Sequence, residues 1–226
     1  MGIRDNLELI RKQIPNDVKL IAVSKTKPIE DLYEAYYVEQ RVFGENKAQE
    51  LKEKAELMPK DIEWHFIGHL QTNKVKYIVP FVSLIHSIDS LRLLSEVNKE
   101  AIKNNRIVSC LMQIDIAHEQ TKFGLLKQEA IELLTSVEYN DMKNIIFCGV
   151  MGIGSITDDK EQTRYEFREL KSIFKELKER FFSDTNNFRE ISMGMSDDYM
   201  LAIEEGSTMV RIGSSIFGAR NYGTQL

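Results

Sequence analysis

Eight short apolar segments, each followed by a stretch with helical spacing, constrain the fold of this 226-residue chain more than any other feature. Several are unbroken runs of Val, Ile, Leu and Phe, as expected for strands buried on both faces of a parallel sheet. The predicted strands span residues 19–24, 41–46, 63–68, 83–89, 106–116, 144–154, 189–196 and 208–218. The spacing of apolar residues predicts one helix before the first strand and further helices between the strands.

Eight strand–helix units in a chain of this length favour a (β/α)8 barrel of the TIM type, with residues 1–226 as a single domain. An open doubly wound sheet is the alternative. The turn after the first strand reads SKTKP and not GxGxxG, which argues against a dinucleotide-binding sheet. No linker or low-complexity tract indicates a second domain.

The charge balance and the cysteines argue against several classes of protein. The net charge is −5 and the basic residues are scattered, so neither nucleic acid nor a membrane surface is an expected partner. Cys110 and Cys148 lie in apolar runs and are expected to be reduced core residues. The four histidines sit apart in sequence and no Cys/His cluster is present, so no metal site is predicted, although the histidines could meet in space. Without a signal-like or membrane-spanning apolar stretch, a cytoplasmic location is expected.

The turns after the last two predicted strands suggest a phosphate site. In TIM barrels the active site lies at the carboxyl ends of the strands, and phosphate is often bound after strands seven and eight. Gly194 and Gly213 would let the backbone approach an anion, and a helix predicted to begin at Asp197, capped by Ser196, would direct N–H groups toward it. Hydroxyl donors are available from Ser192, Ser196, Ser214 and Ser215. The simpler interpretation is that these residues only form tight turns and a helix cap.

Two basic residues lie beside these turns. Arg211 interrupts the apolar eighth strand, so its charge needs either a carboxylate partner or a ligand in the barrel mouth. Lys25 ends the first strand, which neighbours the eighth in a closed barrel. It is either an ordinary exposed lysine or an amine whose surroundings favour Schiff-base formation. A phosphate site, a partner for a ring nitrogen and an imine-forming lysine are what pyridoxal 5′-phosphate (PLP) requires.

Four blocks of sequence resemble the YggS/PROSC family of PLP-binding proteins: AVSKTKP, FGENKAQE, WHFIGHLQTNK and SMGMSDDYMLAIEEGSTMVRIGSSIFG. The resemblance spans nearly the whole chain and implies a fold like the N-terminal barrel of alanine racemase. It implies that Lys25 carries PLP as a Schiff base, that Arg211 faces the pyridine nitrogen and that Asn46 lies near the cofactor. Ser192, Gly213 and Ser214 are implied as phosphate ligands, and Gly194 completes the predicted cofactor-binding set.

Two segments depart from the family pattern. In QIDIAHEQTKFG the family's spacing of Glu119, Lys122 and Gly124 is kept, but the two residues directly before Glu119 are Ala117 and His118. GVMGIGSITDD lacks the proline usually found soon after this strand. Both departures concern loops expected to cover the cofactor, and neither includes Lys25 or Arg211.

The same residues favour cofactor binding over catalysis. A two-base racemase needs an acid–base group on each face of its substrate, and in alanine racemases the opposing tyrosine comes from a second domain. Here Tyr222 lies in the terminal segment after the last strand, where a precisely positioned base is not expected. Arg211 would also be a poor proton donor to the ring nitrogen, which leaves the ring a weak electron sink.

The resemblance therefore implies a PLP-binding protein of intracellular vitamin B6 homeostasis without robust catalytic activity. Apo forms of PLP-dependent enzymes are candidate partners. Two enzymes remain as alternatives: a single-domain PLP-dependent amino-acid racemase, and a Schiff-base aldolase or isomerase acting on a sugar phosphate. The second uses the same lysine and phosphate site without a bound chromophore, so an absorption spectrum separates it from the others.

Overall fold

The computed structural model describes residues 2–118 and 123–219, and within them eight parallel strands close into a barrel. The strands are β1 (Lys19–Val23), β2 (Val42–Glu45), β3 (Glu63–Phe66), β4 (Leu84–Ile88), β5 (Val108–Ile114), β6 (Ile145–Gly152), β7 (Glu190–Ser192) and β8 (Met209–Ile212). β1 pairs with β8 in parallel, from Lys19 beside Met209 to Ala22 beside Ile212. This pairing confirms the predicted barrel and excludes the open sheet.

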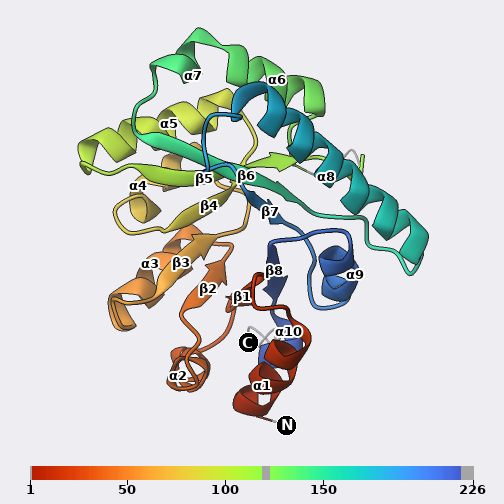
Figure 1. Ribbon diagram of the computed structural model, residues 1–226. Coiled ribbons are helices and arrows are strands. Elements are labelled where there is room, and N and C mark those ends of the chain that lie inside the picture. The colour runs from red at the N-terminus through yellow and green to blue at the C-terminus, as the bar shows by residue number, and fades with distance from the viewer. Residues whose placement is uncertain (1, 119–122, 220–226) are drawn as a thin grey trace, which may run out of the picture.

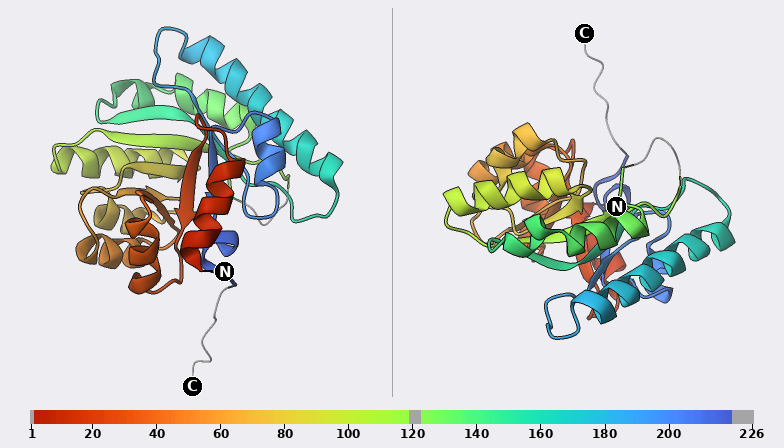
Figure 2. Two further views of the ribbon diagram at one scale, coloured as in Figure 1. Left: turned by 60° about the horizontal axis from the view of Figure 1, so that its bottom comes forward. Right: turned by 90° about the horizontal axis from the view of Figure 1, so that it is seen from above.

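The helices lie outside the strands (Figure 1). They are α1 (Ile3–Gln13), α2 (Ile29–Tyr37), α3 (Ala48–Leu57), α4 (Val75–Ile78), α5 (Leu91–Lys103), α6 (Lys127–Thr135), α7 (Val137–Asp141), α8 (Lys160–Phe181), α9 (Tyr199–Glu204) and α10 (Ser214–Phe217), with a 3-10 turn at Thr72–Lys74. The first and last helices, α1 in red and α10 in blue, lie side by side (Figures 1 and 2). Asn6 joins them by donating from Nδ2 to the carbonyl oxygen of Ile216 over 2.9 Å.

Side-chain caps explain where several helices begin. α5 follows Ser90, whose Oγ accepts a hydrogen bond from the backbone N–H of Leu93. α8 follows Asp159, whose carboxylate accepts from the N–H of Glu161. A cap also separates two neighbouring helices: α6 ends at Thr135, and Ser136 caps the separate helix α7.

The strands separate two layers of the hydrophobic core. The larger layer lies between the strands and the outer helices. The smaller layer fills the barrel itself and consists of Ile21, Leu84, Leu111, Met151 and Met209. Because side chains alternate along a strand, His86 lies on the same face of β4 as Leu84, and Arg211 on the same face of β8 as Met209. The barrel interior therefore contains polar side chains as well as apolar ones.

The last two strands are shorter than predicted. β7 ends at Ser192 and β8 at Ile212, and the residues that follow form turns and the short helices α9 and α10. Ser214, predicted as part of the eighth strand, is the first residue of α10. The shorter strands leave the residues of both turns available at the carboxyl end of the barrel.

Cys110 is buried and Cys148 partly buried, both as free thiols, and burial raises the pKa of each. Within residues 2–118 and 123–219, no helix is long and apolar enough to cross a bilayer. Over the same residues, His, Cys, Asp and Glu side chains form no group of three or more that could hold a metal ion.

Candidate functional site

A cavity of about 440 Å³ opens at the carboxyl ends of the strands and is lined by residues at the end of, or just after, β1, β2, β3, β5, β6, β7 and β8. Five of the seven predicted site residues line it: Lys25, Asn46, Arg211, Gly213 and Ser214. Ser192 and Gly194 are not among the lining residues. The cavity therefore brings the ends of the first and last strands together, as the barrel prediction required.

Two hydrogen bonds hold the side chain of Arg211 in place. It is 4% exposed, and its guanidinium donates from Nη1 to Ser192 Oγ over 2.7 Å and from Nη2 to the carbonyl oxygen of Gly152 over 2.9 Å. Burial lowers the pKa of Arg211 to about 10, while the charge of Asp198 acts in the opposite direction. Arg211 therefore remains a cation at neutral pH, with further N–H groups available besides the two that these acceptors take.

Ser192 and Gly194 have structural surroundings that the sequence did not reveal. Ser192 is fully buried, and its hydroxyl contacts Arg211 and, over 3.0 Å, Nδ1 of His86. Gly194 has a φ of +91°, and a Cβ there would lie 2.5 Å from the Cβ of Ala202. Gly194 thus allows α9 to pack closely against the turn after β7, and its carbonyl oxygen accepts from the backbone N–H of Arg211.

A buried polar cluster supports the turn that carries Lys25. Lys54, on α3, donates to the carbonyl oxygen of Ser24, to Glu45 and to Glu50 over 2.7, 2.7 and 2.8 Å. Ser24 Oγ also donates to Glu45 over 2.6 Å. Burial raises the pKa of Glu45 to about 7, although the charge of Lys54 acts in the opposite direction. These bonds fix the backbone on the N-terminal side of Lys25.

A second amine lies in the same cavity. Lys27 Nζ donates to the carbonyl oxygens of Phe217, Gly218 and Ala219 over 2.8, 3.1 and 2.9 Å. These carbonyls stand at the end of α10, where backbone acceptors lack helical partners. The hydrogen bonds of Lys27 thus join the end of α10 to the turn after β1. Because Lys27 lines the same cavity as Lys25, it can serve as a control in experiments on Lys25.

Asn46 lines the cavity. Its Oδ1 atom is buried and makes no hydrogen bond within the described residues. A buried polar atom without a partner is costly, but this oxygen is closed off from solvent and does not itself face the open cavity. The sequence-based expectation that Asn46 lies near a ligand is compatible with this arrangement.

The turn after β7 differs from the predicted helix cap. α9 begins at Tyr199, and Ser196 does not cap it; Ser196 Oγ instead accepts from the backbone N–H of Gly213 over 3.2 Å. Asp198 accepts from the N–H of Met195 over 2.5 Å. The correction has a physical reason, because the carboxylate of Asp198 accepts within the turn after β7, and the Ser196 hydroxyl joins this turn to the one after β8.

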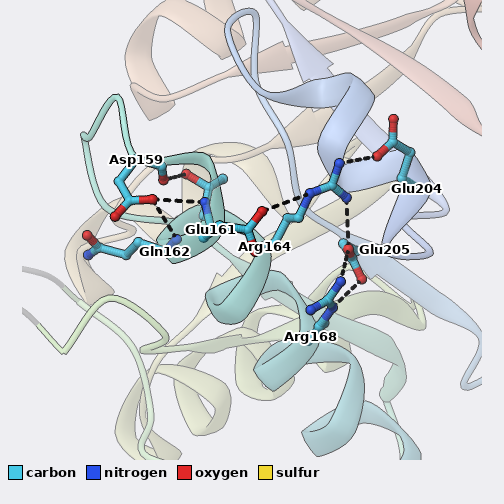
Figure 3. A network of polar contacts seen from close by, with 8 residues as sticks. Asp159, Glu161, Gln162, Arg164, Arg168, Glu204 and Glu205 are labelled. Carbon is cyan, nitrogen blue, oxygen red and sulfur yellow. Dashed lines mark hydrogen bonds and ion pairs between the residues drawn. The ribbon is translucent and has the colours of Figure 1, made fainter.

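Ion pairs with α8 hold α9 in position (Figure 3). Arg164 donates to Glu204 and Glu205, and Arg168 makes two bonds to Glu205, over 2.9 and 3.0 Å. These arginine contacts lower the pKa of Glu205, and the hydrogen bonds from Arg168 have the largest effect. The network lies outside the cavity and anchors the helix that follows the turn at Met195–Asp197.

The opposite side of the cavity is open to solvent. There the ring of Phe123, 53% exposed, stacks on His69 with ring centroids 3.7 Å apart. His69 Nδ1 lies 3.1 Å from a carboxylate oxygen of Asp89. Asp115 lines the cavity beside them. Of the residues named for the family's loop pattern, Glu119 and Lys122 lie outside the described residues, as does Tyr222.

Sequence reasoning missed several contributors. The sequence does not single out Lys27 or Phe123, and it leaves open whether His65 and His86, the two buried histidines near Arg211, meet in space. The alternation of β3 and β4 could have indicated that both histidines face the barrel interior. Their proximity to Ser192 could not be foreseen, because 106 residues separate His86 from Ser192.

Comparison with known proteins identifies the family. The sequence-family model for the N-terminal domain of alanine racemase matches residues 2–221 of this chain. A pyridoxal phosphate homeostasis protein of Aquifex aeolicus is 42% identical over 209 residues, which cover 92% of this chain and 89% of the relative. This chain belongs to the family of pyridoxal phosphate homeostasis proteins. The human member of the homeostasis family is 41% identical over 217 residues, covering 90% of this chain and 77% of its own length.

Solved structures agree with this membership. PipY of Synechococcus elongatus, in a structure with PLP bound, superimposes with a TM-score of 0.87 at 31% identity, covering 96% of this chain and all of that one. Alanine racemase of Clostridium difficile superimposes with a TM-score of 0.79 at 18% identity over 60% of its length. The second similarity concerns the fold alone. The homeostasis family thus shares its barrel with a domain of a larger enzyme.

Proposed function

We propose that this protein binds PLP in the cavity through a Schiff base with Lys25 and acts in intracellular vitamin B6 homeostasis. The observation that carries the proposal is the shared cavity wall of Lys25, Arg211 and the turns after β7 and β8. Membership of the homeostasis family and the PLP-bound structure of PipY support the same conclusion. A cytoplasmic location remains part of the proposal.

The residues present fit this cofactor. The cavity volume of about 440 Å³ lies within the usual range for small-molecule sites. PLP supplies an electrophilic aldehyde and a pyridine ring that can accept electrons. Lys25 would bind the aldehyde carbon, and Arg211 would donate a hydrogen bond to the ring nitrogen. Asn46 would lie against the ligand, since this residue lines the cavity.

The phosphate site combines two turns. Gly213 and Ser214 line the cavity together with Ser196, which already contacts the backbone of Gly213. The first N–H groups of α10 have no acceptor within the helix, so they are available to an anion. Ser196 therefore replaces the buried Ser192 as the proposed hydroxyl donor, and Gly194 contributes by allowing the turn.

Binding is favoured over catalysis by the same geometry. Arg211 stays protonated at neutral pH, so it would hold the ring nitrogen as a hydrogen-bond acceptor and keep the ring a weak electron sink. No tyrosine is found among the described residues that line the cavity, so a tyrosine base like that of alanine racemase is absent from this part of the chain. Apo forms of PLP-dependent enzymes are the proposed recipients of the cofactor.

An absorption spectrum tests the proposal. The purified protein incubated with PLP should show an imine band that borohydride bleaches. Lys25→Ala should lack the band, whereas Lys27→Ala should keep it, because Lys27 is committed to backbone carbonyls. A wild-type protein that takes up no PLP would refute the proposal and favour the sugar-phosphate enzyme.

Racemase activity is tested separately. Loss of optical rotation from L-amino acids, dependent on Lys25, would establish the racemase alternative. We expect no measurable loss over the time in which alanine racemase brings its substrate to equilibrium.

A further inference from the structure

A line of four polar side chains runs through the barrel interior beneath the cavity. Arg211 Nη1 lies 2.7 Å from Ser192 Oγ. Ser192 Oγ lies 3.0 Å from His86 Nδ1, and His86 Nε2 lies 3.0 Å from His65 Nδ1. These residues come from β8, β7, β4 and β3, and none is more than 4% exposed. The line connects a cavity residue with the interior of the barrel.

The chemistry of Arg211 sets the direction of every hydrogen bond in this line. A guanidinium can only donate, so Ser192 Oγ must accept from it. Within the described residues, Ser192 Oγ has only one other polar contact, which is His86 Nδ1. The serine hydrogen therefore points to Nδ1, since otherwise it would be buried without an acceptor.

The direction of the hydrogen bond at His86 then determines the one at His65. With Nδ1 accepting, the neutral ring of His86 carries its hydrogen on Nε2 and donates to His65 Nδ1. His65 in turn carries its hydrogen on Nε2. The opposite direction, from His65 through His86 to the serine, would leave the hydroxyl hydrogen of Ser192 without a partner.

Burial keeps both rings neutral. It lowers the pKa of His65 to about 3, and it lowers the pKa of His86 well below the ordinary value of 6.5. The charges of Arg211 and Lys19 act on His86 in the same direction. A second cation beside Arg211 is thus disfavoured, and the line offers this arginine a neutral acceptor of fixed orientation.

We infer that Ser192, His86 and His65 are positioning residues, which hold Arg211 through a hydrogen-bond chain of fixed direction so that its remaining N–H groups face the cavity. The inference rests on the proposed function for the ligand that Arg211 meets. It assigns Ser192 a role beneath the proposed cofactor site. The two histidines would act on the ligand only through Arg211, without contacting the ligand themselves. Without the chain, Arg211 keeps Gly152 as an acceptor and can rotate away from the cavity.

The direction of the chain can be measured without cofactor. In the wild-type protein labelled with 15N-histidine, nuclear magnetic resonance should show His65 and His86 both neutral with hydrogen on Nε2 at pH 7. Hydrogen on Nδ1 of His86, or a protonated ring, would overturn the inference. This result is independent of whether the protein binds PLP.

The effect on the cofactor site is measured with three variants. Ser192→Ala and His86→Leu should weaken PLP binding roughly ten- to hundredfold and shift the absorption band, because an oriented bond to a charged group is lost. His86→Asn should restore much of the affinity, since its amide oxygen can accept from Ser192. Ser87→Ala is the matched control: Ser87 is equally buried on β4 but its hydroxyl has no partner among residues 2–118 and 123–219, so binding should not change.

The outcomes separate the two proposals. Equal PLP affinity and equal spectra for Ser192→Ala and Ser87→Ala would overturn the positioning role while leaving the proposed function intact. Absence of PLP binding in the wild-type protein would refute the proposed function, whereas the histidine tautomers would still decide the direction of the chain.

Discussion

One part of the cavity wall contains Lys25 and Arg211, which adjoin buried hydrogen bonds, whereas another part contains His69, Asp115 and Phe123, of which His69 and Phe123 are exposed. We call these the supported wall and the exposed wall. Behind the supported wall, Lys54 makes three hydrogen bonds and Arg211 makes two, all with buried or partly buried partners. On the exposed wall the closest ring contact is a stacked pair whose phenylalanine is 53% exposed.

The difference in support between the two walls indicates where this barrel requires exact geometry. In the proposed complex Lys25 and Arg211 would contact opposite ends of one planar ring and so would tolerate little displacement, which a supporting shell of buried bonds limits. The exposed wall faces the entrance, where contacts can change without moving those two side chains. Disturbing the supported wall should therefore cost more stability than disturbing the exposed wall.

The largest effect is expected from Lys54→Met. At pH 8 this change leaves the buried carboxylate of Glu45 without its cation, and the free energy of unfolding should fall by about 3–5 kcal/mol. Urea denaturation measures it. The control is Lys52→Met on the same helix, where an exposed pair with Glu56 is removed and the change should stay within about 0.5 kcal/mol. Equal effects would contradict the distinction between the walls.

A somewhat smaller effect is expected from the titration of Glu45. Burial raises its pKa from 4.5 to about 7 in the folded protein, so between these values the folded state holds a proton that the unfolded state has lost. Stability from this group is present below pH 4.5 and is lost as pH rises through about 7, by at most about 3 kcal/mol.

Glu45→Gln removes this titration while keeping the shape of the side chain. Urea denaturation of both proteins from pH 4.5 to 8 should show the wild type losing stability relative to the variant as pH rises. Parallel curves would mean that Glu45 titrates normally and that the support behind Lys25 is not pH-sensitive.

The smallest effect is expected on the exposed wall. Phe123→Ala removes a ring that is half in solvent, and the free energy of unfolding should change by less than about 1 kcal/mol. Phe66→Ala, at the end of β3 and 1% exposed, is the comparison and should cost about 3–5 kcal/mol. A large loss for Phe123→Ala would show that the entrance is as rigid as the supported wall.

The sequence was sufficient for the fold because the strands are continuous apolar runs. The segment VSCLMQI, for example, becomes β5 with six of its seven residues buried. Element ends were less predictable, because they depend on individual side chains: Ser136 caps the separate helix α7, and Ser196, expected as a helix cap, accepts instead from the backbone N–H of Gly213. Helix α10 was hidden within an apolar segment that resembled the end of a strand.

The site could be predicted in part for a similar reason. Position at a strand end indicated that Lys25, Arg211 and Gly213 would share a cavity, since the carboxyl ends of all strands meet on one side of a barrel. Hydrogen-bond partners were not visible. Lys54 has the sequence context of a helix-surface lysine, yet it is buried, and Ser192 looks like a ligand residue but lies beneath Arg211. Such partners depend on pairs of residues brought together only by the fold.

The most direct test of the central claim is to locate the lysine that binds PLP. The wild-type protein is incubated with PLP, reduced with borohydride and digested, and the modified peptide is sequenced by mass spectrometry. We predict the phosphopyridoxyl group on Lys25 and an unmodified Lys27, which lines the same cavity. Modification of Lys27 in place of Lys25, or modification spread evenly over surface lysines, would contradict the account.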